Sequence, residues 1–125
     1  MIGIVICHRK LAEELLNTAE AILGHHLDLF SFSNDKVTTE ELFNQIERFF
    51  LNIKNPSRGV ILVDLRGGNC WSIGKMIARS HPGFRVITGV NLPMILSFLT
   101  KKNRLTSEEL IEILEKDAHR GIVLE

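Results

Sequence analysis

The apolar residues of this chain gather in short runs, which are separated by stretches with helical spacing. Two of the runs, at residues 2–7 and 60–63, are unbroken, and a polar residue follows each of them directly. Unbroken apolar runs, unlike alternating ones, are typical of strands in a parallel sheet that is covered on both faces. Together with two mixed runs and a short segment near the end, they predict strands at residues 2–7, 27–32, 60–63, 84–88 and 122–124.

Between these runs, apolar residues recur three or four positions apart, as on the buried face of a helix. Two of the stretches open with a capping box, Thr38 with Glu41 and Thr106 with Glu109, and Pro93 suits the first turn of another. The predicted helices lie at about residues 11–23, 39–50, 72–80, 93–99 and 107–118. Regular alternation of strands and helices predicts an α/β fold, a doubly wound, mainly parallel sheet with helices on both faces.

The length and the charge of the chain limit the number of domains and the kinds of partner that we expect. The chain has 125 residues, enough for one domain with a substantial core, and no repeat or linker divides residues 1–125. Basic and acidic residues number 15 each, and this balance argues against nucleic acid or an anionic membrane as a partner. The apolar runs fall well short of the about 20 residues that cross a bilayer, and no charged leader precedes the first run. We therefore expect a cytoplasmic protein without direct membrane insertion.

The cysteines and paired histidines offer weaker signals. Cys7 and Cys70 are too few for a disulfide scaffold, and Cys7 is expected in the core. Cys70 lies beyond Asp64, so both thiols can approach one end of the sheet, and a redox pair is an alternative. His25 and His26 have no further ligands placed nearby in the sequence. We expect no metal site and no cofactor.

The strongest chemical signal is a histidine and an aspartate at the ends of the two unbroken strands. His8 follows residues 2–7 and Asp64 follows residues 60–63. In open parallel sheets, functional groups gather outside the carboxyl ends of the strands, where strand order reverses. A neutral imidazole is a competent nucleophile toward phosphorus, and a carboxylate on one ring nitrogen leaves the other free to attack. The pair predicts a phosphorylatable histidine; a hydrogen-bonded core histidine is the alternative.

The loop after Asp64 is suited to an anion. Gly67 and Gly68 allow the backbone to approach phosphate oxygens at the start of a helix, although a plain tight turn also uses glycines. Asn69 can cap that helix or bond to phosphate, and Arg66 is an anion clamp or a solvated side chain. Asn91, in the loop after residues 84–88, shares the same sheet edge and is expected to line the site.

Three motifs in this order resemble a known family. A first strand that ends in histidine, Val-Asp-x-x-Gly-Gly at 63–68 and Gly-Val-Asn-Leu-Pro-Met at 89–94 resemble the mannose-family enzyme IIA domain of the bacterial sugar phosphotransferase system. The resemblance extends over essentially the whole chain. It implies that His8 receives a phosphoryl group from the histidine phosphocarrier protein and passes it to an enzyme IIB component. It also implies a homodimer in which residues 122–124 form an exchanged, antiparallel strand.

The chain departs from the family pattern beside the histidine and after the paired glycines. Arg9 and Lys10 stand where a small residue, typically glycine, is usual, and Asn69-Cys70 replaces the frequent Ser-Pro. Arg9 can neutralise an incoming phosphate, or it can crowd the surface on which the phosphocarrier docks. Two functions therefore stay open: a phosphoryl-group carrier in sugar uptake or its regulation, and a non-catalytic regulatory or interaction module with the same fold.

Overall fold

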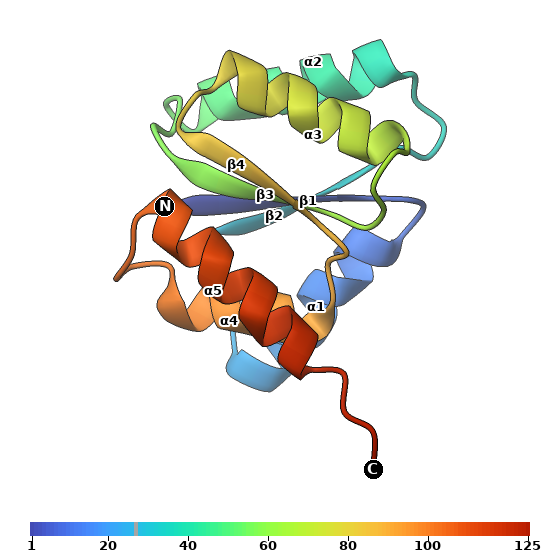
Figure 1. Cartoon of the computed structure of the whole chain (residues 1–125). Helices are drawn as coiled ribbons and strands as arrows, with labels where there is room; N and C mark the ends of the chain where they lie inside the picture. Colours follow the sequence, from blue (N-terminus) through green and yellow to red (C-terminus); the bar gives the residue numbers. More distant parts are fainter. Residues whose placement is uncertain (27) are drawn as a thin grey trace.

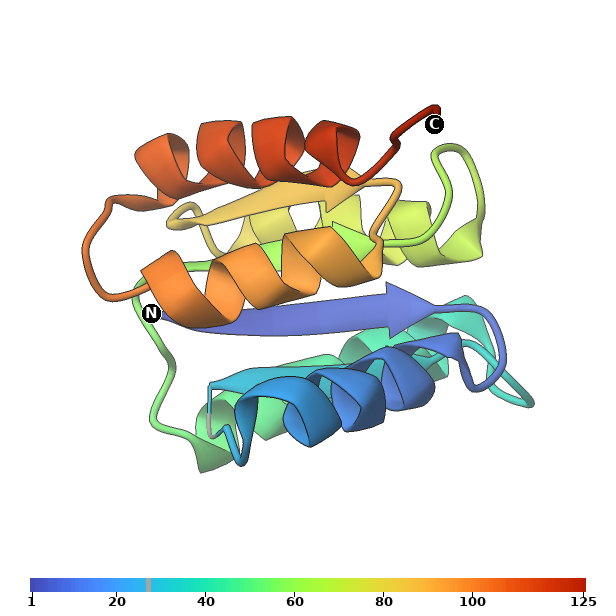
Figure 2. The same ribbon diagram turned by 90° about the horizontal axis from the view of Figure 1, so that it is seen from below.

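The computed structural model describes residues 1–26 and 28–125 and contains one four-stranded, fully parallel sheet (Figure 1). The strand order is β2-β1-β3-β4. The strands are β1 (Ile2–Cys7), β2 (Leu29–Ser33), β3 (Gly59–Val63) and β4 (Phe84–Thr88). Their carboxyl ends point to the same side of the molecule (Figure 2).

Helices cover both faces of the sheet. The helices are α1 (Leu11–Leu23), α2 (Thr39–Asn52), α3 (Asn69–Ser80), α4 (Leu92–Lys101) and α5 (Ser107–Arg120). Helices α2 and α3 lie on one face, while α1, α4 and α5 lie on the other (Figure 1). The predicted doubly wound α/β architecture is confirmed.

The two central strands are apolar throughout because both of their faces are buried. In β1, Val5 and Cys7 pack with α1, α4 and α5, whereas Ile4 and Ile6 pack with α2 and α3. All four side chains are fully buried. Because side chains alternate along a strand, His8 continues the row of Ile4 and Ile6 toward α3. The alternation of side chains that buries both faces of β1 therefore also turns the His8 side chain toward α3.

Both predicted capping boxes are present. The Glu41 N–H donates to Thr38 Oγ1 at 3.1 Å and the Thr38 N–H donates to Glu41 Oε2 at 3.0 Å. Thr106 and Glu109 repeat the arrangement at the start of α5. Pro93 lies in the first turn of α4, as predicted.

Several predicted boundaries shift, and the start of α3 shifts most. Helix α3 begins at Asn69, three positions before the predicted start at Ser72, because Gly68 takes the extended N-cap conformation. Strand β2 runs from Leu29 to Ser33 and not over 27–32, and residue 27 lies outside the described residues.

Residues 122–124 form no strand within the single chain, and the strand exchanged between two chains stays a prediction. Ile122, Val123 and Leu124 are 78%, 68% and 101% exposed and have no regular structure. The segment leads away from α5 into solvent (Figure 1). A strand needs the free edge of a sheet, and here the segment pairs with neither β2 nor β4.

No helix among the described residues combines the length and apolar composition that crossing a bilayer requires.

Candidate functional site

The candidate site lies where the strand order reverses. The chain passes from β1 outward to β2, returns to β3 beside β1, and then continues outward to β4. Ile6 is in register with Val63, so the residues that follow β1 and β3 leave the sheet side by side. This is the crevice in which doubly wound sheets bind their ligands. It brings His8 and Asp64 together across 56 residues of sequence.

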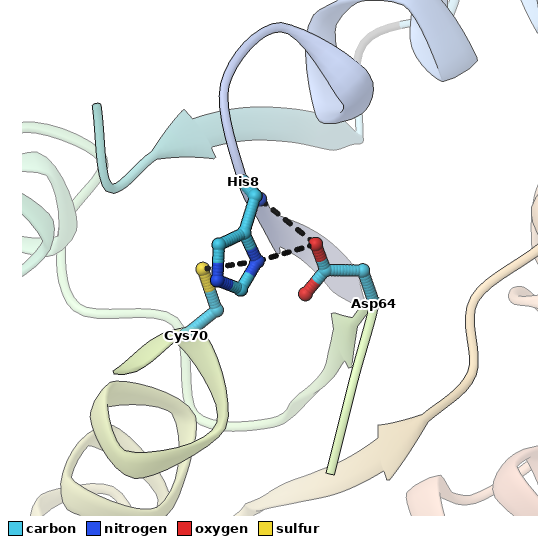
Figure 3. A group of neighbouring side chains, drawn as sticks. All are labelled: His8, Asp64 and Cys70. Carbon is cyan, nitrogen blue, oxygen red and sulfur yellow. Dashed lines mark hydrogen bonds and ion pairs between the residues drawn. The ribbon is translucent and has the colours of Figure 1, made fainter. Parts of the chain in front are cut away.

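One carboxylate oxygen of Asp64 holds His8 at two points. The His8 backbone N–H donates to Asp64 Oδ2 at 2.8 Å, and ring atom Nδ1 lies 2.8 Å from the same oxygen (Figure 3). The other carboxylate oxygen accepts the Leu65 N–H at 2.9 Å. The ring is therefore oriented by the backbone of its own residue as well as by its side chain.

This arrangement assigns the ring proton. A carboxylate only accepts hydrogen bonds, so Nδ1 carries the hydrogen and Nε2 keeps its lone pair. The His8 side chain is 43% exposed, whereas that of Asp64 is 9% exposed. Solvent therefore reaches part of the His8 ring, while the carboxylate that orients it is largely protected.

The surroundings of Asp64 favour its ionised form. Burial alone would raise its pKa, but the hydrogen bonds from the His8 backbone and ring, with that from Leu65, outweigh burial and hold the pKa below its ordinary value. A charged carboxylate beside the imidazole stabilises positive charge on the ring.

The predicted glycine loop approaches the free edge of the imidazole. A Cβ added at Gly68 would lie 3.5 Å from His8 Cε1 and 3.8 Å from Nε2. Gly67 has a φ of +87°, a conformation that L side chains rarely adopt. Gly68 is the N-cap of α3 and makes no side-chain bond, so the amino terminus of α3 lies beside Nε2. Such a terminus favours negative charge, as the sequence predicted for this loop.

The remaining predicted residues take different positions. Asn69 is exposed and is the first residue of α3, so it does not cap the helix. Arg66 is exposed and lines a groove between α3 and β4. Asn91 caps α4 by accepting the Met94 N–H and donates to the Ala118 carbonyl. The roles of these residues toward a phosphate stay predictions.

Arg9 has an unusual backbone. Its φ is +54°, in the left-handed region, and its side chain is exposed. Glycine adopts this conformation without the steric penalty that a Cβ brings. This gives a physical reason why the family usually has a small residue after the histidine.

Sequence reasoning placed Cys70 near the site but missed its contact with His8. Cys70 Sγ lies 3.9 Å from His8 Nδ1 (Figure 3). Burial and the charge of Asp64 raise the pKa of the Cys70 thiol to about 11. Cys7 packs in the core cluster on the opposite face of the sheet, and burial raises its pKa to about 12. Both cysteines are free and protonated, which disfavours the redox pair.

Comparison with known proteins agrees with this geometry. The family described as the PTS (phosphotransferase system) fructose IIA component matches residues 3–115. The chain is 25% identical over 126 residues to the sorbose-specific EIIA component of the PTS from Klebsiella pneumoniae, covering 99% of this chain and 92% of that protein. It is 30% identical over 129 residues to the mannose-specific EIIAB component from Escherichia coli K12, covering 97% of this chain but 38% of that longer protein.

A solved structure of a phosphotransferase system component has the same fold. The phosphotransferase system component EIIA from Streptococcus agalactiae matches with a TM-score of 0.90 at 18% identity, over 98% of this chain and 95% of that one. The chain therefore belongs to the family of IIA components of the sugar phosphotransferase system. The resemblance seen in the sequence is confirmed.

Proposed function

We propose that this chain is a phosphoryl-group carrier that accepts phosphate on Nε2 of His8 from the histidine phosphocarrier protein and passes it to an enzyme IIB component. The observation that carries the proposal is the double hydrogen bond to one oxygen of Asp64, which leaves the Nε2 lone pair free on a half-exposed side chain. The sorbose-specific and mannose-specific names of its relatives support a setting in sugar uptake or its regulation. With these partners, the proposed reaction takes place in the cytoplasm.

The transfer exchanges one nitrogen–phosphorus bond for another. The Nε2 lone pair attacks phosphorus, the bond from phosphorus to the phosphocarrier's histidine breaks, and its electron pair returns to that histidine. The His8 ring gains positive charge, and its Nδ1 hydrogen stays directed at Asp64. Asp64 thereby stabilises the phosphorylated ring without taking up a proton. Transfer to enzyme IIB is the same exchange with His8 as the leaving group.

The proposal is tested by incubating the chain with phosphoenolpyruvate, enzyme I and the phosphocarrier. We expect a base-stable, acid-labile phosphate on the chain, which a IIB component then removes. The second candidate, a non-catalytic regulatory or interaction module, is favoured by the strained and exposed Arg9 beside His8. An unlabelled chain under conditions that label a known IIA component would support the module and reject the carrier.

Gly68→Ala is expected to slow phosphorylation without unfolding the protein. Gly68 has φ −92° and ψ −177°, which alanine adopts freely. The added methyl group would lie 3.5–3.8 Å from the Cε1–Nε2 edge of His8 and occupy space that the phosphoryl group needs. Since misplacing a reacting group by about 1 Å can cost about 100-fold, we expect a loss on the order of ten- to 100-fold in the rate of labelling.

The control for this variant is Gly67→Ala. A methyl group at Gly67 meets nothing within 4 Å, but the φ of +87° makes the substitution strained. We expect Gly67→Ala to lower thermal stability by about 1–2 kcal/mol more than Gly68→Ala does. Equal labelling rates for Gly68→Ala and the parent would show that Gly68 does not border the space that the phosphoryl group occupies.

We also propose a two-fold dimer in which residues 122–124 of each chain add an antiparallel strand to β4 of the other. The edge of β4 is unpaired in the sheet, and a groove of about 650 Å³ runs between it and α3. Trp71 contributes an aromatic side chain to this groove, and Lys75 and Arg79 contribute basic ones. The exposed apolar residues 122–124 are complementary to the apolar part of this groove, and the acidic Glu125 that follows them is complementary to its basic side chains.

Truncation after Arg120 is expected to convert this dimer into monomer or aggregate and to lower its melting temperature, because it removes the added strands and exposes β4. Sedimentation velocity on the intact and truncated chains at micromolar concentrations measures the change. An intact chain that sediments as a monomer throughout this range contradicts the dimer and leaves the fold untouched.

A further inference from the structure

Three different metal-ligand atoms meet at the candidate site. A ring nitrogen of His8, a carboxylate oxygen of Asp64 and Cys70 Sγ all lie within 4.8 Å of one another. They come from the end of β1, the end of β3 and the first turn of α3, and the Asp64 carboxylate and Cys70 Sγ lie on either side of the His8 ring (Figure 3). No metal site was expected from the sequence, because no cluster of ligands stands close together in it.

We propose that His8, Asp64 and Cys70 bind a single Zn²⁺ ion and that the bound ion prevents His8 from accepting a phosphoryl group. The second half of this proposal rests on the proposed carrier function; the binding half does not. Imidazole, thiolate and carboxylate are the three ligand types that zinc takes from proteins, and three of them leave a fourth position for water.

Two of the three distances between ligand atoms are near those of a tetrahedral site. Zinc bonds of about 2.0–2.1 Å to nitrogen and oxygen and about 2.3 Å to sulfur place neighbouring ligand atoms roughly 3.3–3.6 Å apart. Here Nδ1 lies 2.8 Å from Asp64 Oδ2 and 3.9 Å from Cys70 Sγ. These two distances need to change by under about 1 Å, and the His8 ring must also turn so that its nitrogen faces both the carboxylate and the thiolate. The half-exposed His8 gives an ion access, whereas Cys70 itself is buried.

Zinc at this place requires the opposite tautomer of His8. The ion binds the Nδ1 lone pair, so the ring hydrogen moves to Nε2, and the Cys70 thiol releases its proton to solvent as the zinc–sulfur bond forms. Nε2 then has no lone pair for phosphorus. Asp64, which otherwise holds the Nδ1 hydrogen, becomes a ligand. Zinc binding and phosphoryl acceptance are therefore mutually exclusive.

Cys7 provides a matched control because it is the other free cysteine. It lies one residue before His8, but it packs in the cluster formed with α1, α4 and α5, away from Cys70. It does not belong to the group of three ligand atoms. Replacement of Cys7 removes a thiol without removing a proposed ligand.

The binding half is tested with metal alone on the intact chain and on Cys70→Ser and Cys7→Ala, each checked for folding by circular dichroism. We expect one Co²⁺ per chain with a sulfur-to-cobalt charge-transfer band, lost in Cys70→Ser and kept in Cys7→Ala. Competition with a chromophoric chelator should show Zn²⁺ affinity reduced by on the order of 100-fold in Cys70→Ser. A band that persists in Cys70→Ser, or equal Zn²⁺ affinity in that variant and the parent, overturns the site.

The inhibitory half compares labelling by a purified, already phosphorylated phosphocarrier with and without equimolar Zn²⁺. We expect zinc to suppress labelling of the parent and of Cys7→Ala at least tenfold, and chelator to restore it. The ratio of rates with and without zinc should return close to one in Cys70→Ser. If the zinc-loaded parent is labelled as fast as the metal-free parent, the proposal that zinc prevents phosphorylation of His8 is wrong. Failure of the metal-free parent to accept phosphate contradicts the carrier function instead, and the cobalt spectrum still decides the metal site.

Discussion

Replacement of His8 by alanine is expected to abolish phosphorylation of the chain by the phosphocarrier. The imidazole is the only group in the described cluster that combines a free lone pair with solvent exposure, since Asp64 is committed to three hydrogen bonds and Cys70 is buried and protonated. No neighbouring nucleophile in this cluster can take its place. We expect the base-stable, acid-labile label to fall to background.

The fold should survive this substitution. His8 lies beyond the last residue of β1, its side chain is half-exposed, and its backbone N–H still donates to Asp64 in the variant. Circular dichroism and thermal denaturation check this expectation. His119→Ala is the matched control, because it removes an exposed imidazole from the end of α5. Label that persists in His8→Ala, or that disappears from His119→Ala, contradicts the assignment.

The parts of the fold that the sequence predicted best are those dictated by local rules. The unbroken apolar run of β1 is buried on both faces, and Thr38 and Thr106 begin their helices with the hydrogen bonds that the capping-box pattern requires. The meeting of His8 with Asp64 was also predictable, because strand ends of a doubly wound sheet converge at the point where strand order reverses.

The sequence was least informative where distant contacts or the backbone conformation determine the ends of an element or the position of a side chain. Helix α3 begins early because Gly68 adopts an extended N-cap conformation, which no side-chain pattern reports. The contact of Cys70 with His8 depends on that early start, since it places Cys70 in the first turn of α3 against the histidine. The segment 122–124 has strand-like composition but finds no sheet edge within its own chain.

Arg9 links the departures from the family pattern to the site. A non-glycine residue at φ +54° carries a steric cost of about 1–2 kcal/mol, next to the proposed phosphoryl acceptor. Its exposed guanidinium adds positive charge one residue from His8, which can neutralise an incoming phosphate or crowd the surface on which a partner docks. Together with Cys70, Arg9 distinguishes this site from the common family sequence while leaving the His8–Asp64 pair intact.

Asp64→Asn is expected to reduce the rate of phosphoryl transfer by about 10²–10⁴-fold. Asparagine preserves the size of the side chain but removes the charge that supports the phosphorylated ring. Its amide can also donate to Nδ1, which moves the ring hydrogen to Nε2 and selects the tautomer without a free lone pair. Rapid-quench measurement of labelling from the phosphorylated phosphocarrier gives the rate.

The charge of Asp64 also makes a testable contribution to stability. Its pKa in the folded protein is held below the ordinary value, so the carboxylate stabilises the fold above the unfolded-state pKa of about 3.9, and this contribution is lost as the pH falls through the lower folded-state value. The difference in unfolding free energy between the parent and Asp64→Asn should therefore narrow below about pH 4.

Asp117→Asn is the matched control for both measurements. Asp117 is a partly buried carboxylate that accepts hydrogen bonds from Lys101 and Ser97, which hold its pKa below the ordinary value, and it joins α4 to α5 away from His8. We expect its replacement to lower stability with the same dependence on pH but to leave the transfer rate within about twofold of the parent. If Asp64→Asn transfers phosphate as fast as Asp117→Asn, Asp64 contributes to the fold alone and does not orient the phosphoryl acceptor.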